Sequence, residues 1–230
     1  MNVPHGPLKL DDCTVHGSGS GAELFVVEGD SASSAVARVR DPAFQAVLPM
    51  QGKPLNARRA VPARVAAHPL YAALVGALGT GIGDRCDAAV VRYDRVLLLM
   101  DPDADGIHCG VLMLMFFHRW LRPLLEGGHV EVVRPPWGEI IVADERSPRL
   151  AFSEPEFQSL ADHLRGQGGI PGRSAGVARR YRGLAGIDAG ILHATCVAPA
   201  SRRTSRMTGG DVERMIALLD QIGSPDGPDA

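Results

Sequence analysis

The amino-acid sequence predicts an α/β fold in which a four-stranded parallel sheet is flanked by helices, with a small mixed tail domain after it. Two observations carry this prediction. Segments of strand type alternate along the chain with segments of helix type, as in folds built from strand–helix–strand units. The strand-type segments are also continuously apolar, which is typical of parallel strands covered on both faces.

The main sheet is expected from four apolar segments, which cover residues 23–27, 44–48, 95–100 and 129–134. Helices are predicted over residues 31–39, 69–78 and 107–125. Asp or Ser caps the first, proline stands in the first turn of the second, and the third is apolar on most sides and therefore buried. The glycine-rich segment at residues 79–83 follows a helix and is interpreted as a turn, because a phosphate-binding glycine loop precedes its helix.

The part after residue 136 is less regular. A strand is predicted over 139–143, helices over 154–166 and 211–222, and a glycine-rich loop over 166–176. These patterns divide the chain into four expected units: a flexible lead-in at 1–21, the main α/β domain at 22–136, the tail domain at 137–223, and a disordered end at 224–230.

Composition limits the class of protein. The chain has 230 residues, 45% of them hydrophobic, a net charge of −2 and four scattered cysteines. No apolar run is long enough to cross a membrane, and no signal peptide is seen at the amino terminus. Absence of a C-x-x-C pair argues against a zinc site and for reduced thiols in the cytoplasm. Two arginine-rich blocks, at 34–68 and 171–206, flank an acidic centre, which suits a polyanion held beside a metal.

The acidic centre follows two of the predicted strands. Glu28 stands after the first strand, and Asp101, Asp103 and Asp105 stand at every second position after the third, just before Gly106. Carboxylates this close repel one another, so a divalent cation held by oxygen ligands is expected. If the two strands are neighbours, all four acids converge at one edge of the sheet. A plain polar turn is the alternative for the aspartate segment alone.

Ordered blocks along nearly the whole chain resemble one family. The sequence is similar to the Toprim region and following tail of the B subunit of type IIA DNA topoisomerases, the group of DNA gyrase and topoisomerase IV. The blocks that carry the resemblance lie at residues 8–13, 23–32, 44–56, 77–83, 99–108, 116–130, 134–137, 179–184 and 198–203.

The resemblance implies a Toprim fold and a set of roles. The residues that match the family's catalytic acids and Mg²⁺ ligands are Glu28, Asp101 and Asp103, and Asp105 is a further acid of the metal motif, with Mn²⁺ or Ca²⁺ able to substitute in binding. Glu28 is expected to act as general acid/base. The residues implied to bind DNA are Lys53, Asn56, Arg58, Arg202 and Arg203.

The resemblance also implies partners and a location. Double-stranded DNA is the expected substrate, at the nucleoid in the cytoplasm, and a topoisomerase A subunit is expected to supply the nucleophilic tyrosine. We expect no ATP site in this chain, so a separately encoded ATPase subunit is a further expected partner. Several positions depart from the family pattern: Gln51 replaces an arginine, Pro102 stands inside the acid cluster, and Gly186 replaces an acid.

Other functions remain open from the residues. A degenerate, non-catalytic module that binds DNA or a partner and a Toprim nuclease are the two alternatives within the family. An EF-hand calcium loop would need glutamate where Leu112 stands. A phosphatase of the haloacid-dehalogenase type would use Asp101 as nucleophile and leave Glu28 and Lys53 without linked roles.

Overall fold

The computed structural model describes residues 9–142, 145–167 and 176–222. Its main sheet has the strand order β2-β1-β3-β4-β8. Four strands run parallel, as predicted, and they are β1 (Glu23–Glu28), β2 (Gln45–Met50), β3 (Arg95–Leu99) and β4 (Val130–Val133). The fifth strand, β8 (Thr204–Arg206), comes from the tail and pairs with β4 in the antiparallel sense.

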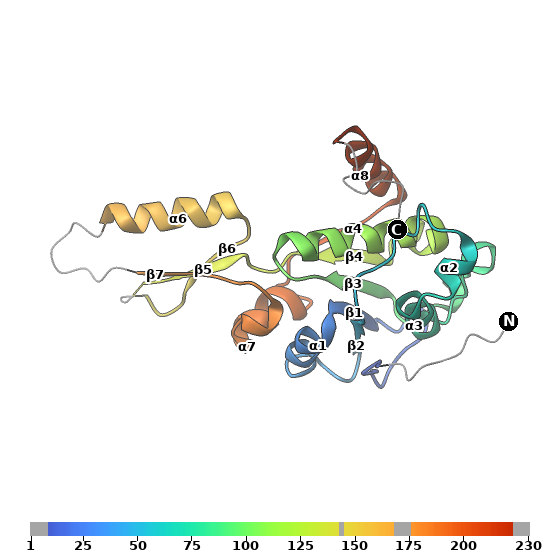
Figure 1. Ribbon diagram of the computed structural model, residues 1–230. Coiled ribbons are helices and arrows are strands. Elements are labelled where there is room, and N and C mark those ends of the chain that lie inside the picture. Colours follow the sequence, from blue (N-terminus) through green and yellow to red (C-terminus); the bar gives the residue numbers. More distant parts are fainter. Residues whose placement is uncertain (1–8, 143–144, 168–175, 223–230) are drawn as a thin grey trace.

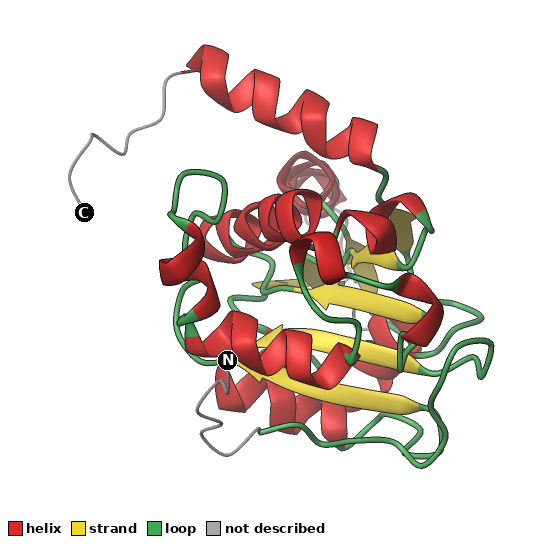
Figure 2. Cartoon of the chain, turned by 90° about the vertical axis from the view of Figure 1, so that its right-hand side faces the viewer, coloured by secondary structure: helices red, strands yellow, loops and turns green. Residues whose placement is uncertain are grey.

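Helices cover both faces of this sheet (Figure 1, Figure 2). Alternate residues of a strand point to opposite faces, so Leu24 and Val26 join one core cluster and Phe25 and Val27 the other. The first cluster is closed by α3 (Pro69–Leu78) and α4 (Ala104–Trp120), and the second by α1 (Gly29–Ala37) and α7 (Ala189–Leu192). The predicted α/β fold with a covered parallel sheet is thereby confirmed.

The helix expected at 107–125 is two helices. The first is α4, which begins three residues earlier because the Asp103 carboxylate accepts a hydrogen bond from the Gly106 N–H and caps it. Leu121 leaves the helical conformation with φ −131°, and α5 (Arg122–Glu126) follows with proline in its first turn. Shorter helices complete this part, among them α2 (Pro62–Ala66).

A second, small sheet projects from the main body (Figure 1). Its strands are antiparallel in the order β6-β5-β7, and they are β5 (Gly138–Ile141), β6 (Arg149–Ala151) and β7 (Val177–Arg180). Helix α6 (Glu154–Gln167) packs on one face, where the ring centroids of Trp137 and Phe157 lie 5.0 Å apart. The chain then returns to the main body through α7, β8 and α8 (Gly209–Ile222). The expected tail at 137–223 is therefore shared between the small sheet and the main layers.

Residues 9–21 differ from the expected flexible lead-in, because polar contacts hold them against the sheet. The backbones of Asp11 and Val47 form an antiparallel bridge, and the Asp12 carboxylate accepts hydrogen bonds from Tyr93 and Arg92, each at 2.6 Å. Residues 1–8, 168–175 and 224–230, on which other lead-in, loop and tail expectations fall, lie outside the described residues. Within the described ranges, no helix is both long enough and apolar enough to span a membrane.

Candidate metal site at the carboxyl edge of the sheet

The structure brings Glu28 and Asp101 together. β1 and β3 are parallel neighbours, with Val27 opposite Leu99, so the residues that follow them emerge at the same edge. There a Glu28 carboxylate oxygen accepts a hydrogen bond from the Asp101 N–H at 3.0 Å. The acid after the first strand and the aspartate motif after the third therefore form one site, although 73 positions separate these two residues.

Gly106 makes this approach possible. A Cβ atom at position 106 would lie 2.2 Å from the Asp101 carbonyl oxygen and 2.7 Å from the Glu28 carboxylate. The Glu28 side chain could move aside, but the Asp101 carbonyl belongs to the backbone and cannot do so without a shift of the chain. The glycine that ends the D-x-D-x-D-G motif is thus required by space at the start of α4, a reason that the sequence pattern alone does not show.

The two later aspartates lie at the start of α4, Asp103 as its N-cap and Asp105 in its first turn, and they have different partners. Asp103 accepts a hydrogen bond from the Gly106 N–H at 2.8 Å. Asp105 is exposed and forms an ion pair with Lys53, whose Nζ lies 2.7 Å from a carboxylate oxygen. This ion pair lowers the pKa of Asp105 and brings the loop after β2 to the acidic edge.

The electrostatics of the edge suit a cation. Burial is the largest cause that raises the pKa of Glu28, the charges of the three aspartates add to it, and the hydrogen bond from Asp101 opposes it. Burial also raises the pKa of Asp101, and the charge of Asp103 adds to that effect. Half-buried acids that repel one another are stabilised when a positive charge comes between them. The residues therefore fit a divalent cation.

Ligand atoms of Glu28, Asp105 and Cys109 all lie within 4.8 Å of one another. Sequence reasoning missed Cys109, which faces this site from the second turn of α4 and is buried. Burial above all, with the nearby carboxylates, raises the pKa of its thiol to about 11. A protonated thiol is a poor ligand for a hard cation such as Mg²⁺, whereas carboxylate oxygens are good ones. The donor set thus favours binding through the carboxylates.

Asp101 has a further contact from outside the sheet. One of its carboxylate oxygens, Oδ1, accepts a hydrogen bond at 2.9 Å from the N–H of Leu184, in the turn after β7. The match of residues 179–184 to the family gave no sign of this contact.

Two of the expected DNA-binding residues lie on the loop beside the acids, and a third follows it. Lys53 is paired with Asp105, as described above. The Asn56 side chain accepts a hydrogen bond from the Arg58 N–H at 3.2 Å. Arg58 forms a two-pronged ion pair with Asp220 of α8, at 2.8 Å for each hydrogen bond, on the wall of an open pocket between α4 and α8.

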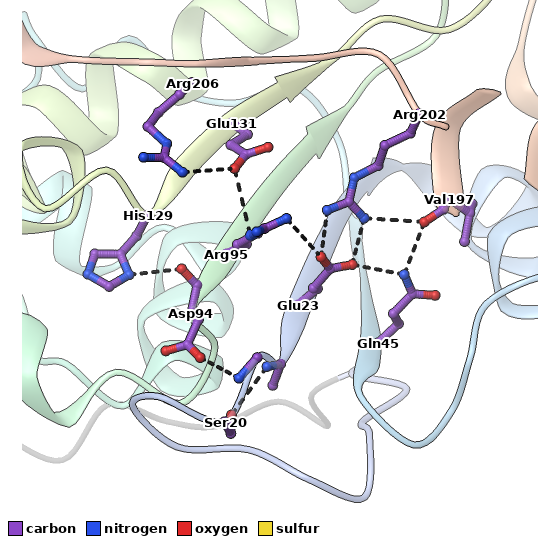
Figure 3. Close-up of polar contacts among 12 residues, drawn as sticks. Ser20, Glu23, Gln45, Asp94, Arg95, His129, Glu131, Val197, Arg202 and Arg206 are labelled. Atoms are coloured by element: carbon purple, nitrogen blue, oxygen red, sulfur yellow. Dashed lines mark hydrogen bonds and ion pairs between the residues drawn. The ribbon is translucent and has the colours of Figure 1, made fainter. Parts of the chain in front are cut away.

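The structure does not bring Arg202 and Arg203 to the acidic edge. Arg202 is buried and donates hydrogen bonds of 2.6 and 2.5 Å to the two carboxylate oxygens of Glu23 (Figure 3). Glu23 begins β1, so this ion pair lies at the end of the strand opposite to Glu28. Arg203 is exposed, with its guanidinium 3.7 Å from the ring centroid of Phe152.

The fold and the acidic edge together define a Toprim domain. The family model for the Toprim domain matches residues 23–135, which run from the start of β1 to just beyond β4. Over nearly its whole length the chain is also similar to the B subunit of DNA gyrase, as its motifs had indicated. The identity is 35% over 220 residues to the protein of Halalkalibacterium halodurans and 34% over 220 residues to that of Archaeoglobus fulgidus, each match covering 96% of this chain and 33% of the relative.

The corresponding gyrase protein of Mycobacterium tuberculosis is 37% identical over 218 residues, which are 95% of this chain and 31% of that protein. The chain thus spans about a third of the length of the curated relatives that it matches.

Proposed function

We propose that this chain supports Mg²⁺-dependent cleavage and religation of double-stranded DNA, as the Toprim part of a type II topoisomerase. One observation carries the proposal: the hydrogen bond from the Asp101 N–H to Glu28 joins the two acidic motifs at one edge of the sheet. In this proposal Glu28, Asp101 and Asp103 hold the cation and Asp105 assists. The bound cation stabilises negative charge on the scissile phosphate.

Glu28 is suited to move a proton. Its raised pKa, due first to burial, brings the carboxyl closer to neutral pH, where a general acid/base is most effective. We assign it protonation of the sugar oxygen that leaves on cleavage and removal of that proton on religation. Lys53 and Asn56 lie on the loop that would face the DNA backbone.

The nucleophile is proposed to come from a partner A subunit, because the tyrosines of this chain are occupied. Tyr71, Tyr93 and Tyr181 are each at most 2% exposed. Their hydroxyls donate hydrogen bonds to the Leu55 carbonyl, Asp12 and Glu139 respectively. Burial raises the pKa of each. A buried, bonded phenol is a poor attacking group for DNA. A location at the nucleoid follows from this proposal.

The test mixes the chain with the A subunit of the same organism, supercoiled plasmid and Mg²⁺, and measures protein-linked DNA breaks after denaturation. Breaks should form with the unaltered chain and fall at least a hundredfold with Glu28→Gln or Asp101→Asn. Glu154→Gln is the matched control, because Glu154 is exposed at the start of α6, the helix that packs on the small sheet. Equal break formation by all four proteins would contradict the assignment.

A non-catalytic module that binds DNA or a partner is the second candidate. The observation in its favour is that Lys53, Arg58 and Arg202 are already in ion pairs, which leaves these cations less available to hold DNA for cleavage. The same assay separates the candidates. Binding of plasmid or A subunit without any breaks would support the module, and breaks that form without an A subunit would support a nuclease.

A further inference from the structure

A turn outside the matched Toprim region touches the proposed metal site. After β7 the chain runs through Tyr181, Arg182 and Gly183 to Leu184, and there it meets Asp101. The Leu184 N–H donates to Asp101 Oδ1 at 2.9 Å. Gly183 lies against the same carboxylate. The segment thus contacts the first aspartate of the motif from a part of the chain 83 positions away.

The turn is fixed on both sides of this contact. Leu184 is fully buried and belongs to the same core cluster as Val27 and Leu99, the last apolar residues of β1 and β3. Before it, the Tyr181 hydroxyl donates to buried Glu139 at 2.6 Å, and the Tyr181 N–H donates to the Trp137 carbonyl at 3.0 Å. A donor held this firmly restricts the orientation of the carboxylate that it contacts.

Space, and not backbone conformation, favours glycine at position 183. Its φ of −164° and ψ of 162° are extended values that any residue adopts. A Cβ atom there would lie 3.1 Å from Asp101 Oδ2 and 3.4 Å from both Cγ and Oδ1. Any larger residue would therefore push the Asp101 carboxylate aside by a few tenths of an ångström or more.

We propose that the Gly183–Leu184 turn positions Asp101 for cation binding. The inference rests on the proposed function, because Asp101 is taken there as a metal ligand. The Leu184 N–H donates a hydrogen bond to Asp101 Oδ1. Because Gly183 has no side chain, Asp101 Oδ2 can lie beside it without a steric clash. The metal site is then completed by the tail and not by the Toprim sheet alone.

The test compares Gly183→Ala with Gly186→Ala, two substitutions three residues apart in the same turn. A Cβ at position 186 would meet nothing within 4 Å, and Gly186 has no positive φ. Mn²⁺ is titrated into each protein, and the Kd is measured by calorimetry and by the loss of the free-ion electron paramagnetic resonance signal. We expect Gly183→Ala to raise the Kd about tenfold, as for loss of a group that orients a ligand. Gly186→Ala should stay within about twofold of the unaltered chain.

Asp101→Asn is included in the same titration to separate two failures. If Asp101→Asn weakens Mn²⁺ binding and Gly183→Ala does not, the positioning role is wrong and the metal site stands. If the unaltered chain binds no Mn²⁺, both the metal site and the inference fall.

A second variant tests the same contact in case Gly183→Ala does not fold. Replacing the Leu184 peptide N–H by an ester oxygen removes the donor and keeps every side chain. This ester should raise the Mn²⁺ Kd at least threefold, while the midpoint of thermal unfolding without metal shows that the fold is kept. An unchanged Kd in the folded ester would overturn the inference.

Discussion

Glu28 illustrates how a single side chain links stability to the proposed chemistry. Its carboxyl is half-buried beside three aspartates, so it holds its proton more tightly in the folded chain than in the unfolded one. The contribution of Glu28 to the stability of the metal-free protein therefore falls as pH rises from the ordinary pKa of 4.5 through the raised one. A raised pKa is also what a carboxyl needs for proton transfer near neutral pH. The burial of Glu28 therefore lowers its contribution to stability and favours its proposed role.

The first prediction concerns Glu28→Gln. Glutamine keeps an oxygen that accepts from the Asp101 N–H and removes the charge, so without metal at pH 7 the variant should melt about 2 °C higher than the unaltered chain. Below pH 4 the two should melt together. Mg²⁺ should raise the melting temperature of the unaltered chain by mass action and raise that of the variant less.

Differential scanning calorimetry with and without Mg²⁺ makes the comparison, and Glu154→Gln serves as the control for loss of one exposed acid. A metal-free Glu28→Gln protein that melts below the unaltered chain at pH 7 would show that the Glu28 carboxylate is well solvated or paired.

The second prediction concerns two glycines of α4. Gly106→Ala places a Cβ 2.2 Å from the Asp101 carbonyl oxygen and should cost about 2 kcal/mol of stability or more, together with cation binding. At Gly110 the Cβ would lie 3.5 Å from a Met100 side-chain atom, an ordinary contact. Gly110→Ala should therefore stabilise the helix by about 0.5–1 kcal/mol.

Urea unfolding midpoints measure both changes. Equal effects of the two substitutions would mean that the tight contact at position 106 relaxes in solution.

At the scale of elements, the sequence predicts the strands that are buried along their whole length. It does not predict segments whose structure depends on a few contacts with distant residues. The four parallel strands were predictable because both of their faces are apolar. By contrast, β8 is the exposed tripeptide T-S-R, which becomes a strand only because β4 offers it a free edge. The order of residues 9–21 likewise comes from Asp11 and Asp12 meeting distant partners.

The residues of the candidate site also fall into those that the sequence predicts and those that it does not. Glu28 and Asp101 were predictable because the carboxyl ends of parallel strands share an edge. Cys109 and the Leu184 N–H were not, because one lies a helical turn away from the motif and the other is a backbone group without a sequence signature.

The third prediction concerns α8, which holds Arg58 through Asp220. If Arg58 binds DNA, as the resemblance to the topoisomerase family implies, Asp220→Asn should release its guanidinium and raise the affinity for a non-specific duplex about threefold, with a salt dependence steeper by about one phosphate contact. Glu213→Gln is the matched control. It removes one charge from the same helix, but Glu213 pairs with His118 and Arg122.

Fluorescence anisotropy with a labelled duplex at several salt concentrations gives both quantities. If both variants bind equally, net charge alone explains the gain and Arg58 has no particular role.

At the scale of the whole molecule, the two ends of the sheet have opposite characters. The carboxyl edge gathers acids that repel one another, whereas at the amino edge the acids are paired with arginines. There Glu23 is held by Arg202 and by Gln45, and Glu131 lies 3.9 Å from both Arg95 and Arg206 (Figure 3). The tail supplies Arg202 and Arg206, so the amino edge attaches the returning chain to the sheet, whereas at the carboxyl edge the tail contacts Asp101 through the Leu184 N–H.

The last prediction follows from the burial of the Arg202–Glu23 pair, whose side chains are 2% and 3% exposed. Arg202→Leu leaves the Glu23 charge buried with only Gln45 and, at 3.6 Å, Arg95, and should lower the free energy of unfolding by about 3 kcal/mol. Adding Glu23→Gln should recover part of that loss, because it removes the unpaired charge.

Arg203→Leu is the neighbouring control, and its free energy of unfolding should stay within about 0.5 kcal/mol of the unaltered chain, since Arg203 is exposed. Urea unfolding of the unaltered chain, Arg202→Leu, the double variant and Arg203→Leu measures these changes. No recovery in the double variant would mean that Arg202 acts through packing of its aliphatic part and not through its charge.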